Sequence, residues 1–154
     1  MNYNELLKEL RTNANLTQEQ LANILNINRV QYNQYENNYN TIPIKHLNKL
    51  SNYFNVSIDY LLGLSKEVQY KDVNKEINSN KSGQRLKEFR KENKMTQDKL
   101  AKILNTNQSV IANYERGRTV IATPFLYTIC KKYNISADYL LGKIDEIKLP
   151  IPSK

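Results

Sequence analysis

The chain repeats itself at an offset of 79 residues, so that residues 7–63 align with residues 86–142 without a gap. About 23 of the 57 aligned positions are identical. The agreement is closest where LTQEQLANILNIN (16–28) meets MTQDKLAKILNTN (95–107). A repeat of this length exceeds the usual unit of a solenoid protein, and each copy is long enough to fold as a small domain. The sequence therefore predicts two related domains in tandem.

Composition marks where these domains end. The stretch between the copies is rich in Lys, Glu, Asn and Ser and poor in apolar residues, as a linker would be. This stretch, residues 64–82, is 19 residues long and would extend to roughly 60 Å. The two prolines near the C-terminus favour an extended tail. The predicted boundaries are a first domain at 1–65, a linker at 66–82, a second domain at 83–146 and a tail at 147–154.

Several classes of protein are disfavoured by composition. The single cysteine, Cys130, excludes an internal disulfide framework and fits a reducing compartment. No apolar run approaches the roughly 18 residues of a membrane span, and the start of the chain lacks the pattern of a signal peptide. The only histidine, His46, has no Cys or carboxylate cluster at metal-ligand spacing. We therefore expect a cytoplasmic, non-enzymatic protein without membrane partner, metal or cofactor.

Local signals within each copy predict five short helices. In the first copy, Thr17 is a strong N-cap, and Asn26 suits the left-handed residue that ends a helix before a tight turn. Asn28 can then cap a third helix that runs to Glu36, and Ser57 opens a short last helix. No segment alternates apolar and polar residues over the length of a strand. The predicted fold class is all-α, with two five-helix domains joined by a polar linker.

The charge of the chain is distributed unevenly over the two copies. The formal net charge is +8, which indicates a nucleic-acid or acidic partner. Residues 1–63 contain five Lys or Arg and five Asp or Glu, so the first copy is neutral. Residues 83–142 contain eleven Lys or Arg against five Asp or Glu, a net charge of +6. The fold is duplicated, whereas most of the basic excess belongs to the second copy.

Two helices joined by a turn of about three residues, with a small alanine in the first of them, have the spacing of a helix-turn-helix. Other motifs accompany this spacing in both copies: LKELR and LKEFR, TQEQLA and TQDKLA, YEN and YERGR, and S-x-DYLLG. With these motifs the chain resembles the phage-repressor and Cro-type helix-turn-helix regulators, the XRE family, over roughly 115 residues. The resemblance implies a repressor-like fold and double-stranded DNA as the partner.

The resemblance also assigns roles to residues of the scaffold. It implies that a salt bridge connects the first helix of each domain to the end of the third, and that this pair orients the third helix more than it stabilises the domain. The pairs are Arg11 with Glu36 and Arg90 with Glu115. The first residue of the second helix matches the family position that contacts a DNA phosphate. These residues are Gln18 and Gln97.

The third helix of each copy carries the positions that face DNA bases in the family. They map to Arg29, Val30, Gln31 and Gln34, and to Gln108, Ser109, Val110 and Asn113. Arg suits guanine, Gln and Asn suit adenine, and Val suits the thymine methyl group. The loop that follows the third helix meets the DNA backbone in the family, and its candidates here are Arg116 and Arg118. All four reading positions differ between the copies, which favours two different half-sites.

Two functions follow from this pattern. The first is a sequence-specific transcriptional regulator, most simply a repressor, that reads the major groove with the third helix of each copy. The alternative is an interaction protein or antitoxin-like regulator. In that case only the second copy binds DNA, and the neutral first copy forms a homodimer or binds a protein partner. An enzymatic function has no residues to support it.

Overall fold

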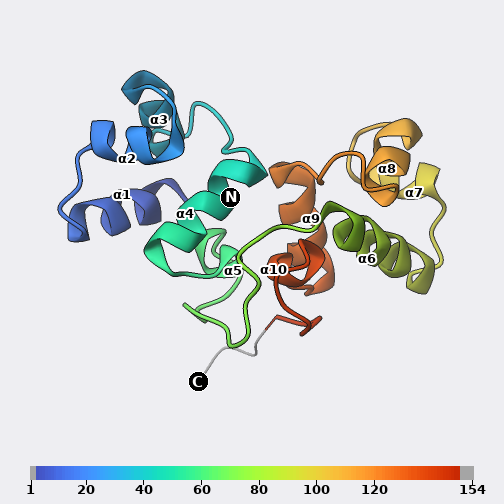
Figure 1. Cartoon of the computed structure of the whole chain (residues 1–154). Coiled ribbons are helices and arrows are strands. Elements are labelled where there is room, and N and C mark those ends of the chain that lie inside the picture. The colour runs from blue at the N-terminus through green and yellow to red at the C-terminus, as the bar shows by residue number, and fades with distance from the viewer. Residues whose placement is uncertain (1–2, 150–154) are drawn as a thin grey trace. The chain divides into compact units, whose positions relative to one another are not determined.

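A computed structural model of the protein describes residues 3–149, and within that range it contains ten helices and no β-strand (Figure 1). The first domain holds α1 (Asn4–Asn13), α2 (Gln18–Leu25), α3 (Arg29–Glu36), α4 (Ile44–Phe54) and α5 (Ile58–Leu61). The second holds α6 (Ser79–Glu92), α7 (Gln97–Ile103), α8 (Gln108–Glu115), α9 (Thr123–Tyr133) and α10 (Ala137–Leu140). The predicted all-α fold with five helices per domain is confirmed. None of these helices is long and apolar enough to cross a membrane.

The predicted capping residues determine where the helices begin and end. The Thr17 side chain accepts a hydrogen bond from the backbone N–H of Gln20, and the Gln20 side chain accepts one from the backbone N–H of Thr17, so α2 begins with a capping box. Asn26 ends α2 with φ of +58°, and Asn105 has the same φ after α7. Asparagine tolerates this left-handed conformation better than other non-glycine residues. Each α-turn-α unit is therefore specified by local chemistry.

Each domain has its own apolar core. The apolar positions of the five helices recur at helical spacing and converge on one centre, where burial of apolar surface stabilises the domain. The fully buried residues of the first domain include Leu7, Leu21, Tyr32, Leu47, Leu50, Ile58 and Leu61. Those of the second include Leu100, Ile111, Leu126, Ile129 and Leu140.

The duplication extends beyond the last helix of each domain. After α5 the chain turns back, and the backbone N–H of Ser57 donates to the carbonyl of Val68 over 2.6 Å. After α10 it does the same, with the N–H of Ser136 donating to the carbonyl of Ile147 over 2.9 Å. These return segments belong to their domains, and the chain divides into compact units between Gln69 and Tyr70.

The connection between the domains is consequently shorter than the sequence predicts. The side chain of Gln69 donates to the carbonyl of Asn55 in the first domain, over 3.0 Å. The backbone N–H of Asn74 already donates to the carbonyl of Lys143 in the second domain, over 2.8 Å. Helix α6 begins at Ser79, so the prediction of a linker through residue 82 is wrong at that end. The five-residue step from Gln69 to Asn74 spans at most roughly 18 Å, in place of the predicted 60 Å.

Gly83 allows α6 to approach the C-terminal end of α8. A Cβ atom at this position would fall against the carbonyl oxygen of Tyr114 and 2.7 Å from that of Glu115. Both contacts involve backbone atoms of α8, which cannot rotate away as a side chain would. The absence of a side chain at Gly83 therefore sets the distance between the first and third helices of the second domain.

We expect Gly83→Ala to lower the free energy of unfolding of the second domain by about 1–3 kcal/mol, the usual cost of overpacking. The substitution improves intrinsic helix propensity, so a loss of stability would report the close contact with α8. Gln84→Ala, at an exposed position on the same helix, is the matched control. The measurement is thermal and urea unfolding of the full chain. Equal stability of the two variants would contradict the assigned role.

Candidate nucleic-acid interface

The helix-turn-helix unit of each domain is built as the sequence predicts. In the first domain, residues 26–28 connect α2 to α3, and Ala22 is fully buried where the helices meet. In the second domain, α7 and α8 repeat this arrangement around buried Ala101. A small side chain at this position lets the two helix backbones approach closely. The arrangement leaves the N-terminal turns of α3 and α8 exposed to solvent.

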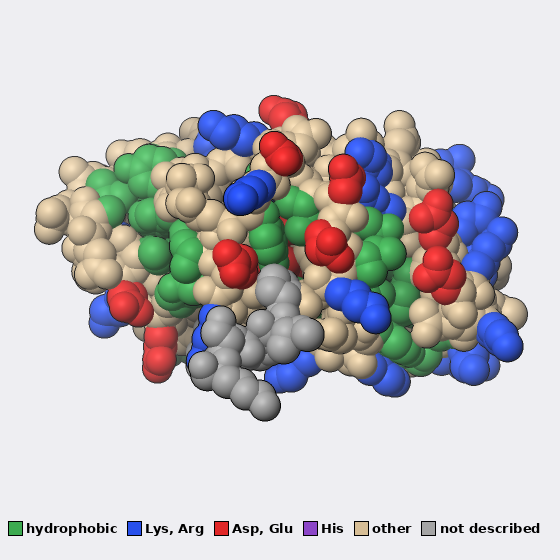
Figure 2. Space-filling model, turned by 90° about the horizontal axis from the view of Figure 1, so that it is seen from below, with side chains coloured by type: hydrophobic (Ala, Val, Ile, Leu, Met, Phe, Trp, Pro, Cys, Tyr) green, Lys and Arg blue, Asp and Glu red, His purple; other side chains and the backbone are tan. Residues whose placement is uncertain are grey.

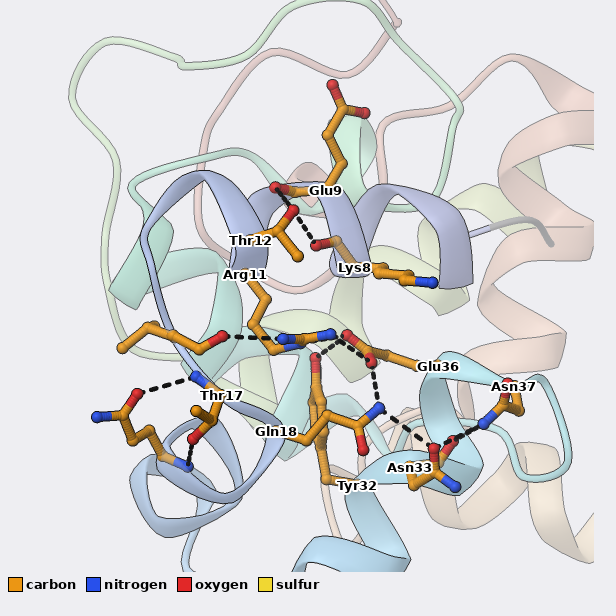
Figure 3. Close-up of polar contacts among 12 residues, drawn as sticks. Lys8, Glu9, Arg11, Thr12, Thr17, Gln18, Tyr32, Asn33, Glu36 and Asn37 are labelled. Carbon is orange, nitrogen blue, oxygen red and sulfur yellow. Dashed lines mark hydrogen bonds and ion pairs between the residues drawn. The ribbon is translucent and has the colours of Figure 1, made fainter.

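A salt bridge holds α1 to the C-terminal end of α3. The Arg11 Nε donates to Glu36 Oε1 over 2.7 Å, and Nη2 donates to Oε2 over 3.3 Å. The third guanidinium nitrogen, Nη1, donates to the carbonyl of Leu16 over 2.8 Å. Figure 3 shows how these groups point toward one another. Because the Glu36 side chain is only 3% exposed, its charge depends on Arg11 for compensation.

The second domain repeats this salt bridge. Arg90 donates from Nε to Glu115 Oε2 over 2.7 Å and from Nη2 to Oε1 over 2.9 Å. Its Nη1 donates to the carbonyl of Met95 over 2.8 Å. The hydrogen bond to glutamate raises the pKa of Arg11 and that of Arg90 above the ordinary arginine value. Each salt bridge therefore connects the first helix of its domain to the third.

Glu36 accepts more hydrogen bonds than its counterpart. The Tyr32 hydroxyl donates to Glu36 Oε1 over 3.1 Å, whereas Ile111 occupies the equivalent position in the second domain. Burial, followed by the nearby charge of Glu36, raises the pKa of Tyr32 far above its ordinary value. The Tyr32 hydroxyl therefore remains a hydrogen-bond donor, and Glu36 accepts from one more side chain than Glu115 does.

The two glutamines of the predicted phosphate position lie at the same place but have different partners. Gln18 Nε2 donates to Glu36 Oε2 over 2.6 Å and to Asn33 Oδ1 over 3.2 Å. Gln97 Nε2 donates to Glu115 Oε1 over 3.3 Å, and its Oε1 accepts from Gln108 Nε2 over 3.2 Å. Both glutamines thus donate to the buried glutamate, but Gln18 also donates to Asn33 (Figure 3), whereas Gln97 accepts from Gln108 at the start of α8.

The predicted reading residues differ in solvent exposure. Five of them are exposed, namely Arg29, Val30, Gln31, Gln108 and Ser109. The other three are half-buried, namely Gln34, Val110 and Asn113. Gln34 is also held, because Asn40 Nδ2 donates to its Oε1 over 2.6 Å. Val30 has 63% of its surface exposed.

The loop after the third helix has the same turn in both domains but different charges. Asn38 has φ of +60° where Gly117 has φ of +75°, so asparagine replaces glycine without changing the turn. Arg116 and Arg118 are exposed on either side of Gly117, and the first domain has no cation at those positions. Tyr39, 79% exposed, stands where the second domain has Arg118. On the face drawn in Figure 2, Lys and Arg side chains crowd the surface of the second domain, at the right.

Sequence patterns did not reveal three asparagines of the first domain that contact the predicted site. Asn37 Nδ2 donates to Asn33 Oδ1 over 2.7 Å, Asn33 accepts from Gln18, and Asn40 holds Gln34. The richness in asparagine of residues 33–40 was the available signal, but composition alone does not identify hydrogen-bond partners. These contacts occupy polar groups that the resemblance assigns to DNA.

Comparison with protein families agrees with this geometry in both domains. A family model described as "Helix-turn-helix" matches residues 7–61, and one described as "Helix-turn-helix domain" matches residues 83–146. The chain therefore belongs to the helix-turn-helix family of DNA-binding transcriptional regulators, XRE type, and carries two such domains in tandem.

Among curated proteins, the HTH-type transcriptional regulator ImmR of Bacillus subtilis is 42% identical over 81 residues, covering 51% of this chain and 64% of that protein. The HTH-type transcriptional activator BcrR of Enterococcus faecalis is 42% identical over 62 residues, covering 40% and 30%. Antitoxin PezA of Streptococcus pneumoniae is 29% identical over 69 residues, covering 45% and 43%. The chain spans less than two thirds of each of these relatives. No solved structure gives a significant match.

Removal of the glutamate should destabilise both domains, and the first more than the second. We expect Glu115→Ala to lower the free energy of unfolding by about 1–3 kcal/mol, because Arg90 loses its buried partner. Glu36→Ala should have the larger effect, since Arg11, Gln18 and Tyr32 all lose an acceptor.

Chemical denaturation of the full chain, monitored by tyrosine fluorescence and circular dichroism, would measure both changes in the free energy of unfolding. Glu9→Ala, which removes an exposed carboxylate of α1, is the control and should change stability little. Unchanged stability of Glu115→Ala, together with lost discrimination between DNA sequences, would show that the pair reads DNA and does not support the fold.

Proposed function

We propose that this protein is a sequence-specific repressor that reads the major groove of double-stranded DNA with α3 of the first domain and α8 of the second. The observation that carries the proposal is a duplicated scaffold beneath two different reading surfaces. The Arg–Glu pair and the glutamine of the second helix are identical in both domains. The four predicted reading positions are all different. Repression is the simplest consequence of binding, because a bound protein excludes polymerase from the same site.

The chemistry of the exposed residues supports reading of base edges. Arg29 has the fork of donors that matches the two acceptors of guanine. The amides of exposed Gln31 and half-buried Asn113 each place an N–H donor beside a carbonyl acceptor, an arrangement that matches the edge of adenine. Val30 offers an exposed apolar surface of the size that packs on a thymine methyl group. We infer that the first half-site contains guanine, adenine and thymine, and that the second contains adenine.

The second domain supplies most of the affinity in this proposal. Phosphate neutralisation dominates non-specific binding, and the second domain carries the charge for it. Exposed cations of this domain include Lys87, Lys91, Lys94, Arg116 and Arg118. The first domain, with a net charge of zero, contributes mainly through its contacts with bases.

We expect Arg116→Ala and Arg118→Ala each to weaken binding to any duplex sequence. If each arginine contacts one phosphate, the slope of log affinity against log salt should fall in magnitude by about 0.9 per substitution. Lys8→Ala, at an exposed position of the first domain, is the matched control and should leave the slope unchanged. Fluorescence anisotropy over a range of salt concentrations gives both values. Equal effects of all three substitutions would contradict the assignment of affinity to the second domain.

A single chain that engages both domains should select an asymmetric site. A homodimer presents one helix twice and selects an inverted repeat, whereas the two linked helices here present different side chains. Arg29→Ala should relax specificity in one half of the selected site and Asn113→Ala in the other, each at a cost of about 1–3 kcal/mol. Binding-site selection with each variant is the measurement. A perfect inverted repeat, altered alike by both substitutions, would mean that one domain from each of two chains does the reading.

The first domain also has features of a surface that binds protein. It is neutral, Val30 and Tyr39 are exposed, and three asparagines occupy polar groups near its recognition helix. The similarity to an antitoxin is consistent with this second candidate function, in which only the second domain binds DNA. The length of the DNase I footprint separates the two functions. A chain that binds as a monomer protects more DNA than one domain can cover only if both of its domains bind.

A further inference from the structure

The two glutamines at the predicted phosphate position differ in the number of N–H groups that remain for a ligand. A glutamine amide has two N–H donors. In the first domain both are used, because Gln18 Nε2 donates to Glu36 and to Asn33. In the second domain Gln97 Nε2 donates to Glu115 alone, and its other N–H meets no acceptor among residues 3–149.

This difference arises from one position on the third helix. Asn33 supplies the acceptor that holds the second N–H of Gln18, and the equivalent residue of the second domain is Ala112. Alanine has no side-chain acceptor. Asn33 is itself held in place, since Asn37 Nδ2 donates to its Oδ1 over 2.7 Å and to its carbonyl oxygen over 3.0 Å. Arg116 stands at the position of Asn37 in the second domain, so neither part of this arrangement is duplicated.

We propose that Asn33 is a positioning residue that keeps Gln18 from donating to a DNA phosphate, so that the first domain holds the DNA backbone more weakly than the second. Asn33 touches Gln18 and acts through it. A phosphate that approached Gln18 would have to displace either the 2.6 Å bond to Glu36 or the bond to Asn33. Gln97 can meet a phosphate without breaking any hydrogen bond that it makes within residues 3–149. The inference rests on the proposed binding of DNA by both domains.

The test exchanges the two residues between the domains of the full chain. Asn33→Ala gives the first domain the residue of the second and should release one N–H of Gln18. The affinity for a mixed-sequence DNA duplex, measured by fluorescence anisotropy, should rise roughly three- to tenfold, as expected for one hydrogen bond. The slope against salt should not change, because an amide adds no charge. Arg116→Ala and Arg118→Ala are introduced in the background to lower the contribution of the second domain.

The reciprocal exchange uses the second domain of the otherwise unchanged chain. Ala112→Asn places an acceptor beside the spare N–H of Gln97 and should weaken binding by a similar factor. Ala112→Leu, which adds about the same bulk without an acceptor, is the matched control. Asn13→Ala, an exposed substitution elsewhere in the first domain, controls for the loss of an amide. Thermal unfolding confirms that each variant is folded.

The decisive variant combines Asn33→Ala with Gln18→Ala. The gain from Asn33→Ala must vanish when Gln18 is absent, and a gain that persists would overturn the proposal. Equal affinity of Asn33→Ala and its parent, while the parent still binds the duplex, overturns the role of Asn33 and leaves the proposed function intact. If the unmodified chain fails to bind duplex DNA at all, the proposed function fails, and the role of Asn33 with it.

Discussion

The buried Arg–Glu pair joins the first helix of each domain to the C-terminal end of the recognition helix, and the surrounding polar contacts are organised around it. The carboxylate of Glu36 or Glu115 accepts from the arginine and also from the glutamine that begins the second helix. Three helices of the helix-turn-helix domain therefore meet at one side chain. Because an unpaired buried charge is costly, the pair constrains the orientation of the recognition helix in both domains.

Around this common centre the two domains have diverged in their polar contacts. The first domain adds Tyr32, which donates to Glu36, and Asn33, which accepts from Gln18. The second domain has Ile111 and Ala112 at those positions, and its glutamine accepts a hydrogen bond from Gln108 on the recognition helix. The same backbone thus supports one domain in which both N–H groups of the glutamine donate to neighbouring side chains and one in which a single N–H does so.

The sequence predicted the parts of this fold that rest on local chemistry or on duplication. Thr17 marks the start of α2 because its side chain caps the helix, and Asn26 marks the end because asparagine tolerates the left-handed conformation. The Arg–Glu pairs were predictable because they occur in both copies and match a family position. The return segments escaped prediction because backbone hydrogen bonds, such as that from Ser57 to Val68, leave almost no trace in residue type. The contacts of Asn33 and the close approach at Gly83 depend on tertiary geometry, which neither motif nor periodicity encodes.

The shortness of the connection between Gln69 and Asn74 affects how a weak domain contributes to binding. If both domains bind DNA as proposed, a short tether keeps the first domain near the adjacent DNA when the second is bound, at an effective concentration on the order of millimolar. At that concentration even a domain whose own dissociation constant is poor occupies its site for much of the time. Avidity can therefore replace phosphate contacts in the first domain, and its sequence is free to serve discrimination. The length of the tether then limits the distance between the two half-sites that one chain can bind together. A half-site beyond that reach gains nothing from the raised effective concentration.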